Sequence, residues 1–234
     1  MRPSTAAVAG PLASRVRVRQ ARASEDVAAQ ILDGFYADGL KPGEWLGTEA
    51  ELAERFSVSR VTIRDAVSAL EARGLIDVRV GARGGLRIAK SDPERLIDAF
   101  SIQLRLMGLS RAELFEAMLA IEPVTAALAA ERGLLEQAAE LERLVACARA
   151  ALDEPIEFGR LGVAFHQAIA DMSGNRALRA SLAALRSPQL EHMGPPPARR
   201  IAERVLRQHA AIAQAIVAGD VAAAGKHMRA HLTL

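Results

Sequence analysis

Ser57-Val-Ser-Arg-Val-Thr-Ile-Arg-Asp-Ala-Val-Ser-Ala-Leu-Glu-Ala-Arg-Gly74 is the segment with the strongest structural signal in the N-terminal part of this chain. Its apolar residues recur at i, i+3, i+4 and i+7, as one face of a helix requires: Ile63, Ala66, Val67 and Leu70. Ser59 can cap this helix and Gly74 can end it. Arg60 and Arg64 lie one turn apart on another face. The arginines suit a helix that enters the DNA major groove, but a solvated surface helix has the same features, so the flanking segments must decide.

The segment before this helix predicts two more helices. Ser24 can cap the first, which would begin at Glu25 and stop at Gly39. Thr48-Glu49-Ala50-Glu51 is a capping box and opens a short second helix. Only Ser57 and Val58 separate that helix from the arginine-bearing one. So tight a connection makes two helices cross steeply, and the pair is predicted to form a helix-turn-helix.

The segment after the arginine-bearing helix predicts a β-hairpin. Two short apolar runs, 75–80 and 86–88, flank the glycine-rich loop Gly81-Ala-Arg-Gly-Gly85. A hairpin in this place is a wing, whose loop can bring backbone N–H groups close to phosphate. We expect Gly81 and Arg83 to lie at the wing tip.

Residues 24–90 resemble the winged helix of the GntR family of bacterial transcription regulators. The matching segments are Leu40-Lys-Pro-Gly43, Thr48-Glu49, Glu51-Leu52-Ala53, Val58-Ser59-Arg60, Ile63-Arg64, Ala66, Leu70, Gly74-Leu75-Ile76 and the glycine-rich wing. The resemblance implies binding to double-stranded DNA through Thr48, Ser59, Arg60, Val61, Thr62, Arg64, Gly81 and Arg83. One position departs from the family: Ala50 stands where an arginine that contacts DNA is common.

Length and composition suit two modest domains in a mainly α protein. The chain has 234 residues, is 50% hydrophobic and contains 3% aromatic residues, which favours close-packed helices. Residues 1–23 are expected to be a disordered basic arm, residues 24–90 the winged helix-turn-helix, and residues 91–234 an all-helical domain. Cys147 is the single cysteine, which excludes an internal disulfide and suits the cytoplasm. Neither a membrane-spanning run nor a secretory signal is present in the sequence.

The second domain is predicted to be an antiparallel bundle of about seven helices. Glycines and prolines punctuate it, and Ser110-Arg-Ala-Glu113 is a second capping box. The expected helices span roughly 94–107, 111–132, 135–152, 157–173, 176–192, 198–218 and 221–232. Pro123 lies inside the second of them, where it is expected to cause a kink.

Three histidines of this domain lie in patterns that resemble the ligand-binding (FCD) domain of the FadR subgroup: His166, His209 and His231. A lone histidine in such a helix is more often a core or surface residue. The resemblance implies one divalent metal of the zinc or nickel type, held by these histidines with an aspartate, and an effector bound beside it. Here Gly162 takes the place of that aspartate. Met118 takes the place of an arginine that contacts the effector, so the effector is expected to be an organic acid or a more apolar metabolite.

The predicted function is a cytoplasmic, ligand-responsive repressor that binds a palindromic operator as a homodimer, with no enzyme activity. Two alternatives stay open. A three-histidine metal could serve hydrolysis, although no general base has suitable spacing to it. A constitutive regulator could use the bundle only for dimerisation, having lost metal and effector, which the residues at positions 118 and 162 would permit.

Overall fold

The computed structural model describes residues 15–81, 84–133, 135–186 and 198–233. The chain forms two compact units, residues 1–92 and 93–234, and the boundary between them lies two residues after the expected one. No helix in the described part of the chain is long and apolar enough to cross a membrane.

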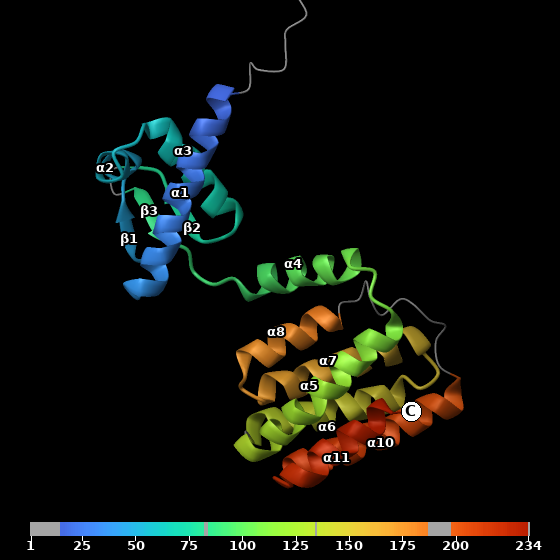
Figure 1. The fold of residues 1–234 in the computed structure, drawn as a ribbon. Coiled ribbons are helices and arrows are strands. Elements are labelled where there is room, and N and C mark those ends of the chain that lie inside the picture. Colours follow the sequence, from blue (N-terminus) through green and yellow to red (C-terminus); the bar gives the residue numbers. More distant parts are fainter. Residues whose placement is uncertain (1–14, 82–83, 134, 187–197, 234) are drawn as a thin grey trace, which may run out of the picture. The chain divides into compact units, whose positions relative to one another are not determined.

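The first unit contains three helices (Figure 1): α1 (Arg15–Ala37), α2 (Glu49–Arg55) and α3 (Arg60–Ala72). The bounds of α2 and α3 agree with the capping signals, because Thr48 closes a capping box with Glu51, and Ser59 accepts from the Thr62 N–H. The start of α1 corrects the expected disordered arm. Residues 15–23 are helical, because Ser24 does not stop the run of arginine, alanine and valine before it; residues 1–14 of the arm lie outside the described residues.

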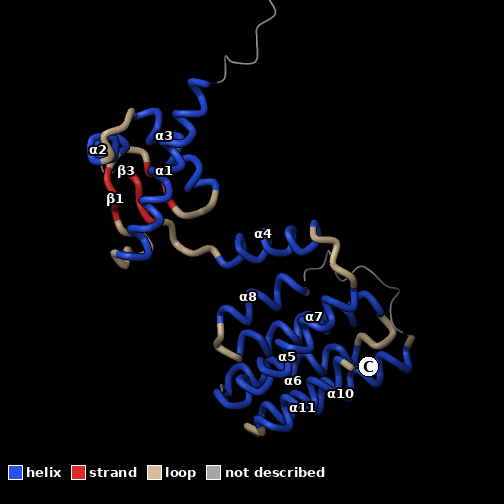
Figure 2. The backbone as a smooth tube through the Cα atoms, in the orientation of Figure 1, coloured by secondary structure: helices blue, strands red, loops and turns tan. Residues whose placement is uncertain are grey.

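A small antiparallel sheet completes this unit, in the order β1-β3-β2 (Figure 2). The predicted wing is β2 (Ile76–Arg79) and β3 (Gly85–Ile88), with Ile76 opposite Ile88. The third strand, β1 (Trp45–Gly47), was not predicted, since three residues carry no measurable alternation. A side chain at position 85 would lie 2.6 Å from Nε1 of Trp45, and φ of Gly85 is +125°, so this crossing of β1 and β3 requires glycine.

The apolar stripe of α3 forms the centre of the first core. Ile63, Ala66 and Leu70 are fully buried, and they pack with Val27 of α1, with Leu52 of α2 and with the sheet. α1, α2 and the sheet therefore fix the position of α3 from its inner face, and its opposite face is left exposed.

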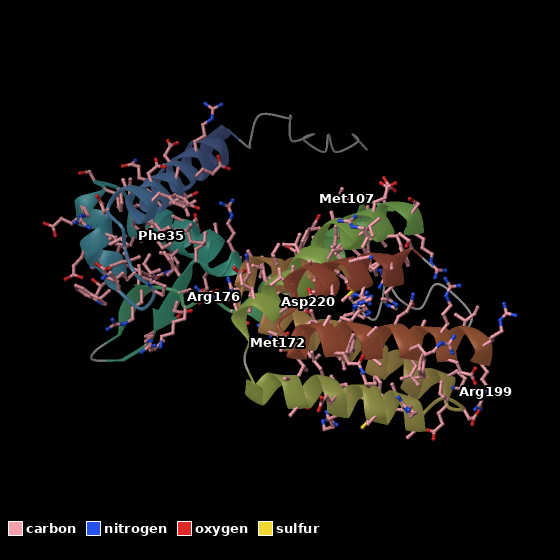
Figure 3. The ribbon with its side chains drawn as sticks, turned by 90° about the horizontal axis from the view of Figure 1, so that it is seen from below. Phe35, Met107, Met172, Arg176, Arg199 and Asp220 are labelled. Carbon is pink, nitrogen blue, oxygen red and sulfur yellow. The ribbon has the colours of Figure 1, made fainter. Side chains whose placement is uncertain are left out.

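The second unit is a bundle of helices (Figure 1): α4 (Pro93–Leu106), α5 (Arg111–Arg132), α6 (Leu135–Ala150), α7 (Pro155–Met172), α8 (Arg176–Leu185), α10 (Arg199–Val217) and α11 (Val221–Leu232). α5 continues through Pro123 to its end at Gly133. α8 ends at Leu185, short of the expected 192, and residues 187–197 lie outside the described part. Arg199 opens α10, and Asp220, in the turn after it, caps α11 (Figure 3).

The bundle core lies among α5, α6, α7, α10 and α11. Phe165, Ile169 and Ile212 are among its fully buried side chains, with Leu141 and Met228. α4 packs apart from this core, against α8, around Leu104, Leu114 and Leu185. The buried polar side chains of the bundle include Glu122, Thr125, His166 and His209, and such burial is rare unless the group has a partner.

Candidate DNA interface and candidate metal centre

The exposed end of α3 is the first candidate site. Ser59, Arg60 and Arg64 are exposed there, and Val61 keeps 53% of its surface accessible. An apolar side chain exposed between two arginines is suited to contact with a base edge, such as a thymine methyl group. This end of the helix therefore joins two planar cationic donors to an apolar contact surface.

Thr62 corrects one of the expected DNA contacts. Its residue is only 5% exposed, and its hydroxyl lies 2.9 Å from the Ser59 Oγ. The Ser59 Oγ also accepts from the Thr62 N–H at 3.1 Å. Thr62 thus secures the start of the helix from within, because its position beside the apolar stripe turns it toward the core.

Arg64 is held by a neighbour on α2. Its Nη2 donates to Oε2 of Glu49 at 2.9 Å, and 65% of its side chain stays exposed. The hydrogen bond and the charge of Glu49 raise the pKa of Arg64. An exposed pair of this kind adds little stability, but it restricts the direction of the guanidinium. Glu49 thus orients Arg64, a role that the sequence did not indicate.

The wing turn is closed at Gly81, whose carbonyl accepts from the Gly84 N–H at 2.8 Å. Gly81 is exposed with φ of +117° and no atom within 4 Å of where a Cβ would lie, so backbone strain rather than crowding favours glycine here. Thr48 is exposed and caps α2, with its hydroxyl 2.9 Å from Glu51 Oε2. Arg83 lies outside the described residues.

The second candidate site is a cluster of three histidines from three helices: His166 of α7, His209 of α10 and His231 of α11. Nε2 of His231 lies 3.2 Å from Nε2 of His166 and 3.3 Å from Nε2 of His209. One ring nitrogen from each histidine falls within 4.8 Å of the others. His209 is held in place by Phe165, whose ring stacks on it at a centroid distance of 4.3 Å. The structure therefore brings together all three predicted ligands.

The partners of Nδ1 determine which nitrogen faces the cluster with a lone pair. Nδ1 of His231 lies 3.2 Å from Oε1 of Gln208, an acceptor, so that Nδ1 carries the proton. Nδ1 of His166 lies 2.5 Å from Oε2 of Glu122, in an ion-pair contact whose angle is poor for a hydrogen bond. A carboxylate beside Nδ1 likewise places the proton there. With the protons on Nδ1, the two Nε2 atoms, 3.2 Å apart, are free to act as metal ligands.

The spacing of these nitrogens suits a metal ion. Ligands at 2.0–2.1 Å in a tetrahedral zinc site are about 3.3 Å apart. The two Nε2 separations match this edge. In such sites, a hydrogen-bonding or acidic partner at Nδ1 usually orients each ligating histidine, as Gln208 and Glu122 can do here. The residues present therefore fit a divalent metal with imidazole ligands.

Burial keeps the three imidazoles neutral, which is the form that binds a metal. Desolvation lowers the pKa of His166, with the Arg186 charge adding to the effect and Glu122 opposing it. Desolvation also lowers the pKa of His209 well below its usual value, and that of His231 to about 3.

The acidic partner of the cluster is Glu122 of α5, which is fully buried. Its Oε1 accepts from Nη2 and Nε of Arg186, the residue after α8, at 2.6 and 2.9 Å. Burial alone would raise the pKa of Glu122, but its contacts with His166 and Arg186 outweigh it and lower the value to about 2. The carboxylate is thus ionised and links α5 to the histidine on α7 and to the end of α8.

Two further expected residues, Gly162 and Met118, lie in different parts of the bundle. A Cβ at Gly162 would come within 3.8 Å of Cε1 of His209, so position 162 lies beside the cluster, and glycine leaves that side uncovered. Met118 packs in the separate apolar cluster around Leu104 and Leu114, one turn before Glu122 on α5.

Sequence reasoning missed Glu122, Arg186 and Gln208 as parts of this centre. A signal for Glu122 did exist, since it is the one charged residue in the run Met118-Leu-Ala-Ile-Glu-Pro-Val-Thr-Ala-Ala-Leu128. No comparable signal marks Arg186 or Gln208, because both follow ordinary amphipathic patterns and reach the centre only through the packing of their helices.

The histidine pKa values predict how metal-free protein responds to pH. A histidine that is neutral when folded and titrates at about 6.5 when unfolded stabilises the fold fully above pH 6.5. As the pH falls from 6.5 toward 3, the unfolded chain binds more protons, so the free energy of unfolding drops, by at most about 1.4 kcal/mol per pH unit for each histidine. Urea unfolding in chelator at pH 7.5, 6.0 and 5.0 measures this slope. His231→Gln should give a shallower slope, and an equal slope would contradict the assignment.

A winged helix-turn-helix followed by a helical bundle with a buried polar centre defines a class of DNA-binding transcription regulators. Comparisons with known proteins agree with this class. Residues 23–84 match the family described as bacterial regulatory proteins, gntR family, and residues 113–234 match the FCD domain. The protein belongs to the GntR family, carries an FCD domain, and is a DNA-binding regulator of transcription rather than an enzyme.

Individual relatives support the same assignment. The HTH-type transcriptional regulator LutR of Bacillus subtilis is 32% identical over 205 residues, covering 83% of this chain and 90% of the relative. The HTH-type transcriptional repressor NanR of Citrobacter rodentium is 27% identical over 98% of this chain and 89% of its own. Among solved structures, Streptococcus agalactiae GntR has a TM-score of 0.58 at 29% identity, over 90% of this chain and 97% of that one.

Proposed function

We propose that this regulator is a ligand-responsive repressor of the FadR subgroup, which binds a palindromic operator as a cytoplasmic homodimer and senses an effector at a metal in its bundle. The observation that carries the proposal is the meeting of three imidazoles from three helices inside the bundle, where Nε2 of His231 lies 3.2 Å from that of His166 and 3.3 Å from that of His209. Ring nitrogens at this spacing can hold a divalent cation.

The operator contacts proposed for α3 are Arg60 and Arg64, with Ser59 and Val61 beside them and Gly81 at the wing. The arginines can each pair with a guanine, and Ser59 lies at the helix end where phosphate is favourably bound. In a homodimer the two copies of α3 would read half-sites about one helical turn apart. Repression follows if the operator overlaps a promoter, and the relative NanR is named a transcriptional repressor.

The metal proposed for the centre is zinc or nickel, held by His166, His209 and His231. Glu122 and Gln208 orient two of the rings through Nδ1. When bound, the metal would act as a Lewis acid toward a ligand, because three protein donors leave at least one coordination position open. Gly162 widens that opening, since it adds no side chain beside His209.

The net charge of this centre favours an anionic effector. The three ligands are neutral, and the negative charge of Glu122 is offset by Arg186 at 2.6 Å. A dication here would therefore keep most of its charge uncompensated in a buried site, which an organic acid with a carboxylate could neutralise. Effector and operator would then antagonise each other, if the effector favours a bundle state that binds DNA less tightly.

The rival function is constitutive DNA binding with a bundle that only dimerises. Its specific support is Gly162, which stands where the FadR subgroup has an acidic ligand. Mobility shifts on an operator selected from a random-sequence library separate the two. Release of DNA by one member of a panel of small carboxylic acids, only with metal present, supports the sensor. No release by any acid, together with protein free of metal, would leave the constitutive regulator.

The metal assignment predicts the composition of the purified protein. Untagged protein prepared without chelator should hold about one zinc or nickel ion per chain by elemental analysis. His166→Ala and His209→Ala should each reduce metal binding to background, because two imidazoles hold a dication weakly. His227→Ala, at a half-buried histidine of α11 outside the cluster, should keep the metal. Background metal in the wild-type protein, even after incubation with zinc, would refute the site.

A further inference from the structure

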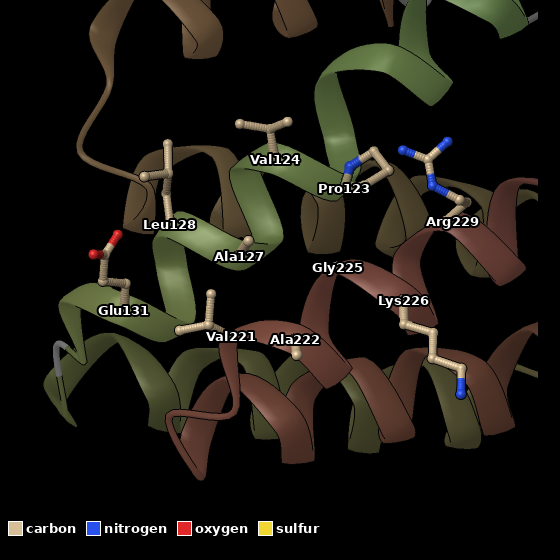
Figure 4. A pocket seen from close by; sticks show the side chains of 10 residues that line it. All are labelled: Pro123, Val124, Ala127, Leu128, Glu131, Val221, Ala222, Gly225, Lys226 and Arg229. Atoms are coloured by element: carbon tan, nitrogen blue, oxygen red, sulfur yellow. The ribbon is translucent and has the colours of Figure 1, made fainter.

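The outward face of α5 and α11 carries a groove of about 500 Å³ between the two helices (Figure 4). The groove is lined by Pro123, Val124, Ala127, Leu128, Glu131, Val221, Ala222, Gly225, Lys226 and Arg229. α5 and α11 lie close together along it, since a Cβ at Gly225 would come within 3.2 Å of the Pro123 carbonyl oxygen. This face is separate from the histidine centre, whose side chains point into the bundle.

The middle of this face is apolar and exposed. Val124 keeps 48% of its surface accessible and Val221 keeps 41%, with the small side chains of Ala127 and Ala222 between them. Contiguous apolar surface of this kind marks interaction sites more often than scattered apolar residues do. The face therefore has the apolar middle that interfaces between protein subunits share.

The two ends of the groove carry opposite charges. Glu131 lies at one end, and Lys226 and Arg229 lie at the other, because α5 and α11 run in opposite directions (Figure 4). All three are exposed, and within the described ranges none of their side chains has an ion-pair partner. A surface with an apolar middle and opposite charges at its ends is complementary to itself.

We infer that this face, which we call the α5–α11 face, is the surface through which two copies of the bundle associate. The inference rests on the homodimer of the proposed function and names its interface. A twofold axis that lies in the interface and crosses the groove places the Glu131 end of one copy against the Lys226 and Arg229 end of the other. In such an isologous contact each charge pair forms twice, and the two apolar strips cover each other.

The packing of the helices is compatible with this arrangement. Val124 and Leu128 are four residues apart on α5, so they form a ridge that can interdigitate with the same ridge of a crossing helix. In this orientation the like charges of the two copies lie at opposite ends of the interface. In the reverse orientation they would meet, so charge selects the orientation as well as the partner.

Two variants of the full-length protein test the interface by sedimentation equilibrium. Val124→Arg should raise the dimer dissociation constant on the order of 100-fold, because it places two cations in the apolar middle. Ile156→Arg is the matched control, since Ile156 is 89% exposed on α7, away from this face, and should leave the dissociation constant unchanged. Circular dichroism verifies that each variant is folded.

Charge exchange tests the orientation and remains decisive if Val124→Arg fails to fold. Glu131→Lys alone and Lys226→Glu with Arg229→Glu should each weaken the dimer about tenfold, and combining all three should restore it. A dimer as tight as wild type in Val124→Arg, or a triple variant weaker than both of its parents, would overturn the interface and leave the proposed function standing. A wild-type chain that stays monomeric at all concentrations would instead remove the homodimer from the proposed function.

Discussion

Replacing Arg60 and Arg64 together by alanine is expected to lower specific operator affinity by at least about 100-fold while the protein stays folded. Each arginine can supply about 1–3 kcal/mol of discrimination, and a dimer loses each contact twice. Neither side chain supports the core, because Arg60 is exposed and Arg64 pairs with Glu49 at the surface. Their removal should therefore change binding without changing stability.

The measurement is a mobility shift on the selected operator and on a scrambled duplex of the same length. Arg73→Ala is the control, since Arg73 is exposed at the opposite end of α3 and should leave the preference for the operator intact. The ratio of operator to scrambled affinity should collapse only in the Arg60 and Arg64 variant. A double variant that kept the wild-type ratio would show that another element reads the sequence.

Replacing Glu122 by alanine is expected to lower the free energy of unfolding of the bundle by about 3–5 kcal/mol. The carboxylate is fully buried and contacts two cationic or polar partners, His166 and Arg186. Without it the guanidinium of Arg186, whose side chain is 14% exposed, loses its buried counter-charge, and the ring of His166 loses its orienting group. Glu122→Gln should be milder, because an amide oxygen can still accept from Arg186.

Urea unfolding followed by circular dichroism, in chelator, measures this effect on the full chain. Glu140→Ala serves as the control, because Glu140 forms an exposed pair with Arg143 and should change stability little. A second measurement separates orientation from stability: Glu122→Gln, if folded, should bind zinc about 10–100-fold more weakly than wild type. Wild-type stability in Glu122→Ala would mean that the buried pair contributes nothing, and unchanged zinc affinity in Glu122→Gln would remove its orienting role.

Much of the fold could be predicted because its signals are local. The capping boxes at Thr48 and Ser110 mark helix starts through hydrogen bonds within four residues, and the structure contains both. Gly133 ends α5 in the left-handed conformation for an equally local reason. Signals failed where they were weak or competing, at the three-residue strand Trp45–Gly47 and at the N-terminal start of α1.

The two-domain plan, the arginine-bearing helix and the three histidines could all be predicted from the chain alone, since periodicity, capping and spacing are local properties. What those residues face depends on the tertiary structure. It buried Thr62, paired Arg64 with Glu49, and brought Glu122 and Arg186 to the histidines from positions 44 and 20 residues away from His166 along the chain. Such contacts depend on which helices pack together, and that depends on the whole core rather than on any local pattern.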